Sequence, residues 1–240
     1  QEAVEEAKAY QTGRSFDLEG YNESVIFSSN GTTKHFIDME LGVERLTELA
    51  GDSLDIWYWY VRFFKPLQRL EYNVKINPSG EVIGFGRRIA EADSGSTLSP
   101  EVAKIMAEAF LKNQLEVDLD LWNYIEVNSN DRPQRRDHSF TYEMKDFNVA
   151  DAPYRLKVEM QGATISGYKR FLKIPEEWRR KYSEQRPDNH MYQNIANFLS
   201  FLIIIVMFFY FFRHIRQRQI PWRATLWLGG ILAVANFAMT

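Results

Sequence analysis

The feature that most constrains the chain is an uncharged, strongly apolar stretch over Met191–Phe212, close to its C-terminal end. As a helix with a rise of 1.5 Å per residue it would reach about 33 Å, which matches the hydrocarbon core of a bilayer. A buried helix of a soluble protein is the alternative, but such a helix is rarely apolar on every side. We therefore expect a transmembrane helix over 191–212.

The charges indicate which side of the membrane each part occupies. All 32 Asp and Glu residues precede residue 191, alongside 25 Lys and Arg, which gives that region a balance of -7. The last 50 residues hold four arginines, Arg213, Arg216, Arg218 and Arg223, and no acidic residue. Because cytoplasmic loops are enriched in Lys and Arg, we place the loop after the span in the cytoplasm and residues 1 to about 190 outside it.

A second uncharged stretch, 224–240, follows this short loop and predicts a return across the membrane. It ends where a span would be barely complete, and the chain starts at Gln1 without a visible signal peptide. We therefore expect a fragment of a larger membrane protein.

The composition excludes several classes of function. The absence of Cys excludes disulfide scaffolds, cysteine-ligated metal sites and thiol catalysis. An acidic outer region gives no electrostatic basis for binding nucleic acid, and we expect no nucleic-acid partner.

The outer region contains an internal repeat. Tyr21-Asn22 leading to Ser29-Asn30 is echoed about 100 residues later by Trp122-Asn123 leading to Ser129-Asn130, and each follows a helical segment. The second helix, from Pro100 to Asn113, has Ser99 as a predicted N-cap, and its apolar residues fall on one face. These apolar residues are Val102, Ile105, Met106, Ala109 and Phe110.

Alternating apolar strands follow each helix and are joined by glycine turns at Asn77–Gly80 and Gln161-Gly162. Each half thus predicts a helix followed by about four antiparallel strands. An amphipathic helix over Phe36–Ala50 is inserted in the first half, whereas the polar composition of Asn128–His138 predicts a loop in the second. Whether the two halves share one sheet stays open.

The fold class is therefore α+β, with two tandem helix-plus-four-stranded repeats followed by C-terminal transmembrane helices. The expected segments are a first extracytoplasmic repeat over 1–92, a second over 99–174, a juxtamembrane helix and linker over 175–190, a transmembrane helix over 191–212, a basic cytoplasmic loop over 213–223 and the start of a second transmembrane helix over 224–240.

The densest aromatic region, Trp57–Phe64, is the candidate for a binding surface. As a strand it places Trp57, Trp59 and Phe63 on one side, and exposed aromatic residues beside a sheet edge suit the addition of a peptide strand. The alternative is burial of these residues between the two repeats. Arg87 and Arg170, at matching places in the two halves, could meet an anionic headgroup or a carboxylate, or simply face solvent.

No catalytic or metal-binding constellation is visible. The four histidines, His35, His138, His190 and His214, are too far apart in the sequence to share a helical turn or strand period. Ser139 is only a sequence neighbour of His138, and no nucleophile motif is present. We expect no catalytic residue, cofactor site or metal site in this chain.

Four segments resemble the outer region of bacterial intramembrane proteases of the CAAX-protease and bacteriocin-processing (CPBP) family. They are TrpTyrTrpTyrValArgPhePhe at 57–64, AspHisSerPheThrTyrGlu at 137–143, GlyTyrLysArgPheLeuLysIlePro at 167–175 and GluTrpArgArg at 177–180. The helix-plus-sheet repeat is also similar to cystatin-like or PepSY-like modules.

The resemblance implies catalysis by a membrane bundle with Glu-Glu-x-x-x-Arg and membrane histidines. Glu176-Glu177 lacks the required Arg, since Lys181 stands there, and so no catalytic residue transfers to this chain. The catalytic bundle, with any metal that the parent protease uses, would follow Thr240.

We therefore expect a cell-membrane protein whose outer region engages or regulates a protein or peptide substrate, with the bilayer and the rest of its own membrane domain as further partners. The alternatives are a tethered sensor or binding module of a transporter or kinase, and a cystatin-like inhibitory module.

Overall fold

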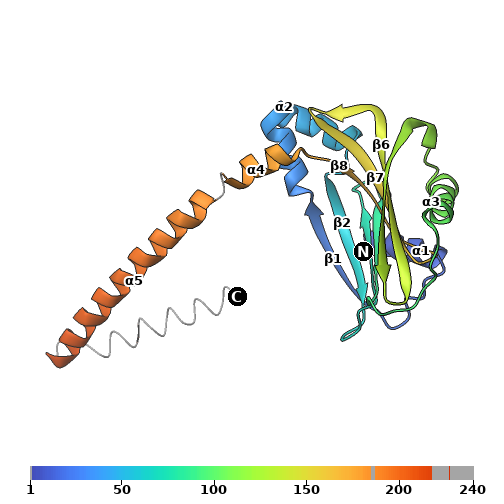
Figure 1. The fold of residues 1–240 in the computed structure, drawn as a ribbon. Helices are drawn as coiled ribbons and strands as arrows, with labels where there is room; N and C mark the ends of the chain where they lie inside the picture. Colours follow the sequence, from blue (N-terminus) through green and yellow to red (C-terminus); the bar gives the residue numbers. More distant parts are fainter. Residues whose placement is uncertain (1, 185–186, 218–226, 228–240) are drawn as a thin grey trace. The chain divides into compact units, whose positions relative to one another are not determined.

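The computed structural model describes residues 2–184, 187–217 and 227 (Figure 1). The chain divides into two compact units, Gln1–Glu176 and Glu177–Thr240. The first unit contains, in chain order, α1 (Glu2–Gly13), β1 (Asn22–Ser29), α2 (Gly31–Asp52), β2 (Trp57–Phe64), β3 (Glu71–Ile76), β4 (Val82–Arg88), α3 (Pro100–Gln114), the 3-10 turn η1 (Leu119–Leu121), β5 (Trp122–Arg132), β6 (Arg135–Val149), β7 (Ala152–Gln161) and β8 (Thr164–Leu172).

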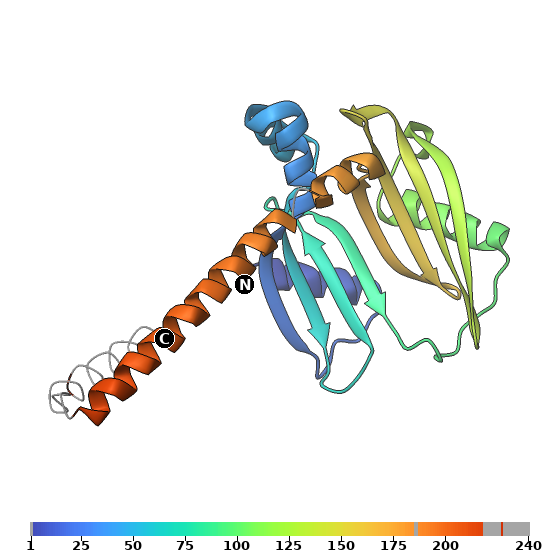
Figure 2. The ribbon, with the colours of Figure 1, turned by 60° about the vertical axis from the view of Figure 1, so that its left-hand side comes forward.

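All eight strands form one antiparallel sheet with the order β1-β2-β3-β4-β8-β7-β6-β5. This order answers the question that the sequence left open, because β4 of the first half pairs directly with β8 of the second. Helix α1 lies behind β1–β4 and α3 behind β5–β8, so both helices cover the same face of the sheet (Figure 2). We call this the covered face and the opposite one the open face.

Local signals explain where these elements begin and turn. The Ser99 hydroxyl accepts a hydrogen bond from the Val102 amide, and Pro100 occupies the first position of α3, as predicted. In the β3–β4 turn the Asn77 side chain accepts hydrogen bonds from the amides of Ser79 and Glu81, while Gly80 has φ +91°. Gly162 likewise has φ +60° at the β7–β8 turn, which favours glycine.

A hydrophobic core runs along the covered face through both halves of the sheet. Strand residues that alternate toward the helices are fully buried, among them Val61, Val74, Leu156 and Val158. Helix α3 contributes Ala103, Ala107, Phe110 and Leu111 to this core.

Three sequence-based expectations need correction. Asn128–His138 is not a loop, since its residues belong to the β5–β6 hairpin, in which Arg132 pairs with Arg135. Val102, Ile105 and Met106 of α3 are exposed, because the small Ala103 and Ala107 face the sheet instead. The inserted helix is longer than Phe36–Ala50, and it bends at Gly42, where φ is +85°.

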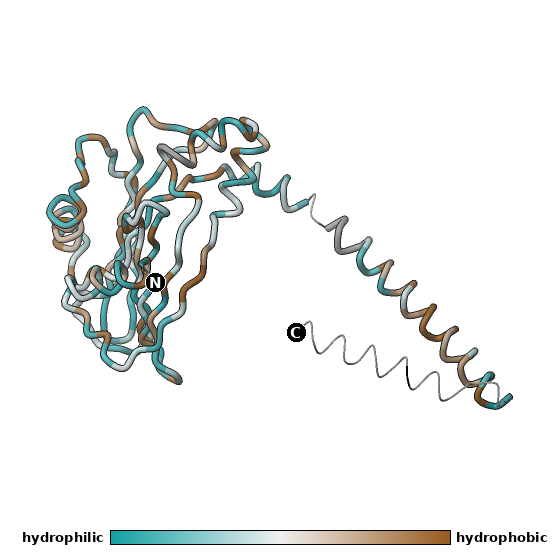
Figure 3. Tube along the Cα trace, turned by 180° about the vertical axis from the view of Figure 1, so that it is seen from behind, coloured by the Kyte–Doolittle hydropathy of each residue, from teal (hydrophilic) through white to brown (hydrophobic). Residues whose placement is uncertain are grey.

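Helix α4 (Glu176–Glu184) begins at the last residue of the first unit, and α5 (Pro187–Arg216) lies in the second. Helix α4 occupies part of the predicted juxtamembrane segment. Within α5, Tyr192–Arg216 is long and apolar enough to cross a membrane, and apolar residues run along much of the helix in Figure 3. The described part of the predicted basic loop, residues 213–217, mainly continues α5. Residues 218–223 and the predicted second span, apart from Trp227, lie outside the described residues.

The β4–β8 junction depends on close backbone approach. A Cβ atom at Gly84 would lie 3.0 Å from the Tyr168 carbonyl oxygen on the neighbouring strand. We therefore expect Gly84→Ala to lower the free energy of unfolding by about 1–3 kcal/mol, measured by urea unfolding with tryptophan fluorescence. Gly31→Ala is the matched control, because no atom lies within 4 Å of its added methyl group. Equal stabilities of the two variants would contradict tight packing at the junction.

Buried tyrosines make the fold sensitive to high pH. Burial raises the pKa of Tyr10 to about 12 and also raises the pKa values of Tyr142, Tyr154 and Tyr168. Above about pH 10 the unfolded chain therefore loses tyrosine protons that the folded chain retains, and stability falls by up to about 1.4 kcal/mol per pH unit for each tyrosine. Urea unfolding at about pH 9 and pH 11, with phenolate absorbance, should show this loss, whereas ionisation of all tyrosines near pH 10 in the folded state would contradict it.

Candidate functional site

Among the strands that the structure describes, β1 is one of the two edge strands of the sheet, the other being β5. Three consecutive apolar side chains of β1 are exposed, with fractions of 42% for Val25, 56% for Ile26 and 52% for Phe27. An edge strand also carries backbone N–H and C=O groups that no neighbouring strand pairs. β1 thus offers both hydrogen-bonding groups and apolar surface to a further strand.

Aromatic residues extend this apolar surface onto the covered face. Phe27 pairs in register with Trp59, and their ring centroids lie 4.8 Å apart. Phe27 also stacks on Trp57 at 6.2 Å, with the rings inclined by 7°. Although Trp57 and Trp59 point to the same face as the core residues of β2, they remain 36% and 39% exposed. We call Val25, Phe27, Trp57 and Trp59 the aromatic edge.

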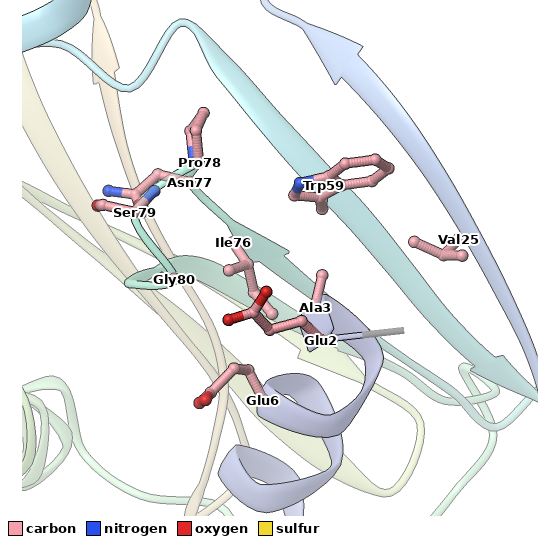
Figure 4. A pocket seen from close by; sticks show the side chains of 10 residues that line it. All are labelled: Glu2, Ala3, Glu6, Val25, Trp59, Ile76, Asn77, Pro78, Ser79 and Gly80. Carbon is pink, nitrogen blue, oxygen red and sulfur yellow. Dashed lines mark hydrogen bonds between the residues drawn. The ribbon is translucent and has the colours of Figure 1, made fainter.

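A pocket of about 280 Å³ adjoins this edge (Figure 4). Val25 and Trp59 form one side, the turn Asn77–Gly80 forms another, and Ile76 and Ala3 contribute apolar groups. The carboxylates of Glu2 and Glu6, from the first turns of α1, also lie at the pocket. The pocket therefore combines apolar groups with the polar turn and with the two carboxylates of α1.

Lys8 is the basic residue of α1 nearest in sequence to Glu2 and Glu6, and it forms ion pairs with other carboxylates. Its ammonium group lies 2.9 Å from a Glu23 carboxylate oxygen and 3.7 Å from one of Glu5. The hydrogen bond to Glu23 raises the pKa of Lys8. Among the residues that the structure describes, neither Glu2 nor Glu6 forms an ion pair.

The predicted surface residues separate into three groups. Trp57 and Trp59 lie together on the aromatic edge and are 36% and 39% exposed, so the alternative of burial does not apply to these two residues. Phe63 is only 1% exposed and belongs to the core, which excludes it from a binding surface.

Neither Arg87 nor Arg170 lines the pocket. The Arg170 guanidinium pairs with Asp55 at 3.5 Å and Glu81 at 3.1 Å, and Arg87 lies at the end of β4, 5.8 Å from the Phe16 ring centroid. The structure therefore does not bring these arginines into one site with the tryptophans.

His138 has a partner that the sequence did not suggest. Its Nδ1 lies 2.8 Å from the Ser129 hydroxyl across the β5–β6 hairpin, and its Nε2 lies 3.1 Å from the Leu98 carbonyl oxygen. The ring thereby connects the linker before α3 to the sheet. Within the described residues, no group of three or more His, Asp or Glu side chains is arranged to hold a metal ion.

A larger pocket, of about 580 Å³, lies where β4 leads into the linker, and most of its lining side chains are charged. Arg132 and Arg135 both pair with Asp137 there. The aromatic edge is the stronger candidate because it combines exposed apolar side chains with the backbone groups of an edge strand.

Sequence reasoning missed Val25–Phe27, Glu2 and Glu6. The run of three apolar residues in the first strand was an available signal, because a strand with one solvated face alternates instead. The carboxylates gave no signal, since their position at the pocket depends on how α1 packs on the sheet.

Comparison of the chain with known proteins finds no match among family models, curated proteins or solved structures.

Proposed function

We propose that Gln1–Glu176 is the extracytoplasmic, substrate-engaging region of a membrane protein, and that it binds an extended protein segment along β1. The observation that carries this proposal is the free β1 edge with Val25, Ile26 and Phe27 exposed beside Trp57 and Trp59. No residue of this region is assigned a catalytic role.

The addition of a strand would use both the backbone hydrogen-bonding groups of β1 and the exposed apolar side chains beside them. Main-chain hydrogen bonds to β1 provide affinity for any extended segment, while the side-chain surface provides selectivity. Strand β1 has eight residues, which sets the length of the segment that pairs with it. Covering the exposed side chains removes apolar surface from water, worth about 25 cal/mol for each Å².

The apolar helix α5 supports attachment to a membrane, and Arg213 and Arg216 at its end support the orientation. Basic residues favour the cytoplasmic side, which puts the preceding unit outside the cytoplasm. In that arrangement the domain would meet substrates outside the cell or in a periplasm.

The two halves of the sheet support an origin as two cystatin-like or PepSY-like repeats. Each consists of a helix and four strands in sequence, with α2 added to the first, and the last strands of the two halves meet at the β4–β8 junction. In this account the repeats provide a rigid frame that holds β1 at its outer edge.

The parent protein that we propose is an intramembrane protease of the CAAX-protease and bacteriocin-processing family. Its support is the resemblance of the four segments described above, together with the membrane helix. The sequence that follows Thr240 tests this part. Further spans with Glu-Glu-x-x-x-Arg and membrane histidines are expected, whereas a histidine-kinase or transport domain would favour the tethered sensor instead.

Binding of a peptide tests the function of the edge. We expect the full chain in lipid nanodiscs to bind a fluorescein-labelled peptide of nine alternating threonine and valine residues, with saturable fluorescence anisotropy. The same peptide with every backbone nitrogen methylated should not bind, because it lacks the N–H donors that strand pairing needs on either edge. Equal binding of both peptides would contradict strand addition, and no binding of either would contradict the proposed function.

A further inference from the structure

We propose that the pocket beside the aromatic edge receives a lysine or arginine side chain of the bound segment. This inference rests on the proposed function and specifies its substrate class as extended segments with one basic residue at a fixed position. The shape of the pocket, the carboxylates of Glu2 and Glu6 and the ring of Trp59 together support it.

The position of the pocket fits a side chain from an added strand. Val25 and Trp59 line it and point to the covered face of the sheet. In a strand added to β1, alternate side chains would point to that same face. Since adjacent strands lie about 4.8 Å apart, a side chain opposite Val25 would have to extend over Val25 toward the pocket. Lys and Arg have stems long enough for this, and they keep their charged heads in polar surroundings.

The charge of the pocket selects a cation. Glu2 and Glu6 are one helical turn apart on the same side of α1, and both line the pocket. The N-terminus of α1 contributes roughly half a positive charge, which two carboxylates outweigh. Lys8 does not neutralise them because it is bound to Glu23 and Glu5.

Trp59 offers an aromatic face to the same cation. A lysine ammonium group already lies over each of two neighbouring rings of β2. The Lys34 Nζ is 4.9 Å from the Trp57 ring centroid, and the Lys75 Nζ is 4.5 Å from the Tyr58 ring centroid. Throughout the described part of the chain, no lysine or arginine lies over Trp59. A cation near a tryptophan ring is favoured by about 0.5–1 kcal/mol at an exposed site.

The pocket, of about 280 Å³, has room for one lysine or arginine side chain. Its apolar groups, Ala3 and Ile76, would contact the methylene stem, while the carboxylates would contact the head.

Peptides that differ at one residue test the inference. We would measure anisotropy of the full chain in nanodiscs with the threonine–valine peptide carrying lysine, leucine or glutamate at its centre. We expect the lysine peptide to bind about fivefold to tenfold more tightly than the leucine peptide, and the glutamate peptide to bind most weakly. The preference should decrease at high salt, because the charges are only partly shielded from water.

The double variant Glu2→Gln with Glu6→Gln should remove the preference for lysine while leaving the leucine peptide bound. Glu5→Gln is the matched control, because Glu5 lies on the same helix but does not line the pocket. If lysine and leucine peptides bind equally to the unmodified chain, the inference fails and the edge-binding function stands. If no peptide binds, the proposed function itself fails.

Discussion

Replacing Arg135 with methionine should lower the free energy of unfolding by about 3–5 kcal/mol, the usual cost of removing one partner from a buried ion pair. The Arg135 side chain is only 3% exposed, and its Nε lies 2.8 Å from an Asp137 carboxylate oxygen. Its Nη1 also donates to the carbonyl oxygens of Ala90 at 2.9 Å and Asp93 at 2.6 Å. Arg135 thus attaches the linker between the two halves to β6.

The adjacent Arg136 provides the control. Its side chain is 35% exposed and pairs with the largely exposed Asp131, so Arg136→Met should change stability by less than about 1 kcal/mol. Urea unfolding of both variants with tryptophan fluorescence gives the comparison. A loss below about 1 kcal/mol for Arg135→Met would show that the linker is not held in this way.

Placing lysine at Ile26 should weaken binding of the threonine–valine peptide by at least about tenfold. Ile26 is 56% exposed in the middle of β1, and a lysine on an edge strand disfavours pairing with a further strand. Because the side chain is already largely in water, stability should change by no more than about 0.5 kcal/mol. Fluorescence anisotropy and urea unfolding measure the two effects separately.

Ile125→Lys is the matched control at the other free edge. Ile125 lies on β5, is 41% exposed, and sits where the register with β6 shifts. Peptide binding should be unchanged in this variant. Equal losses in the two variants would assign the effect to charge rather than to the β1 edge.

Local features of the sequence predicted much of the secondary structure. Ser99 and Pro100 marked the start of α3, and the glycines at 80 and 162 marked two hairpin turns, because each of these signals depends on only a few neighbouring residues. The loop that polar composition predicted at Asn128–His138 is wrong. Strand β5 is exposed over most of its length, so its polar residues have the composition of a loop.

Long-range packing could not be predicted in this way. The single sheet depends on pairing of Gly84–Gly86 with Gly167–Lys169, about 80 residues away, for which no local signal exists. The periodicity of α3 correctly predicted that Phe110 belongs to the core, but Val102, Ile105 and Met106 are exposed and the helix packs through Ala103, Ala107 and Leu111 instead.

The candidate site was predicted in part. The alternation of β2 placed Trp57, Trp59 and Phe63 on one face correctly, and only the packing of the fold shows that Phe63 is buried while the tryptophans are not. Glu2 and Glu6 reach the same place from a different element, which makes the pocket a property of the tertiary structure.

Hydrogen exchange of the backbone amides tests the central claim most directly. The full chain in nanodiscs would be compared with and without a saturating concentration of the lysine-containing peptide. If a segment adds to the sheet at β1, amides of residues 22–29 should exchange more slowly with the peptide present, and those of residues 122–132 should be unchanged. Protection of β5 instead, or bound peptide without protection of β1, would contradict the account.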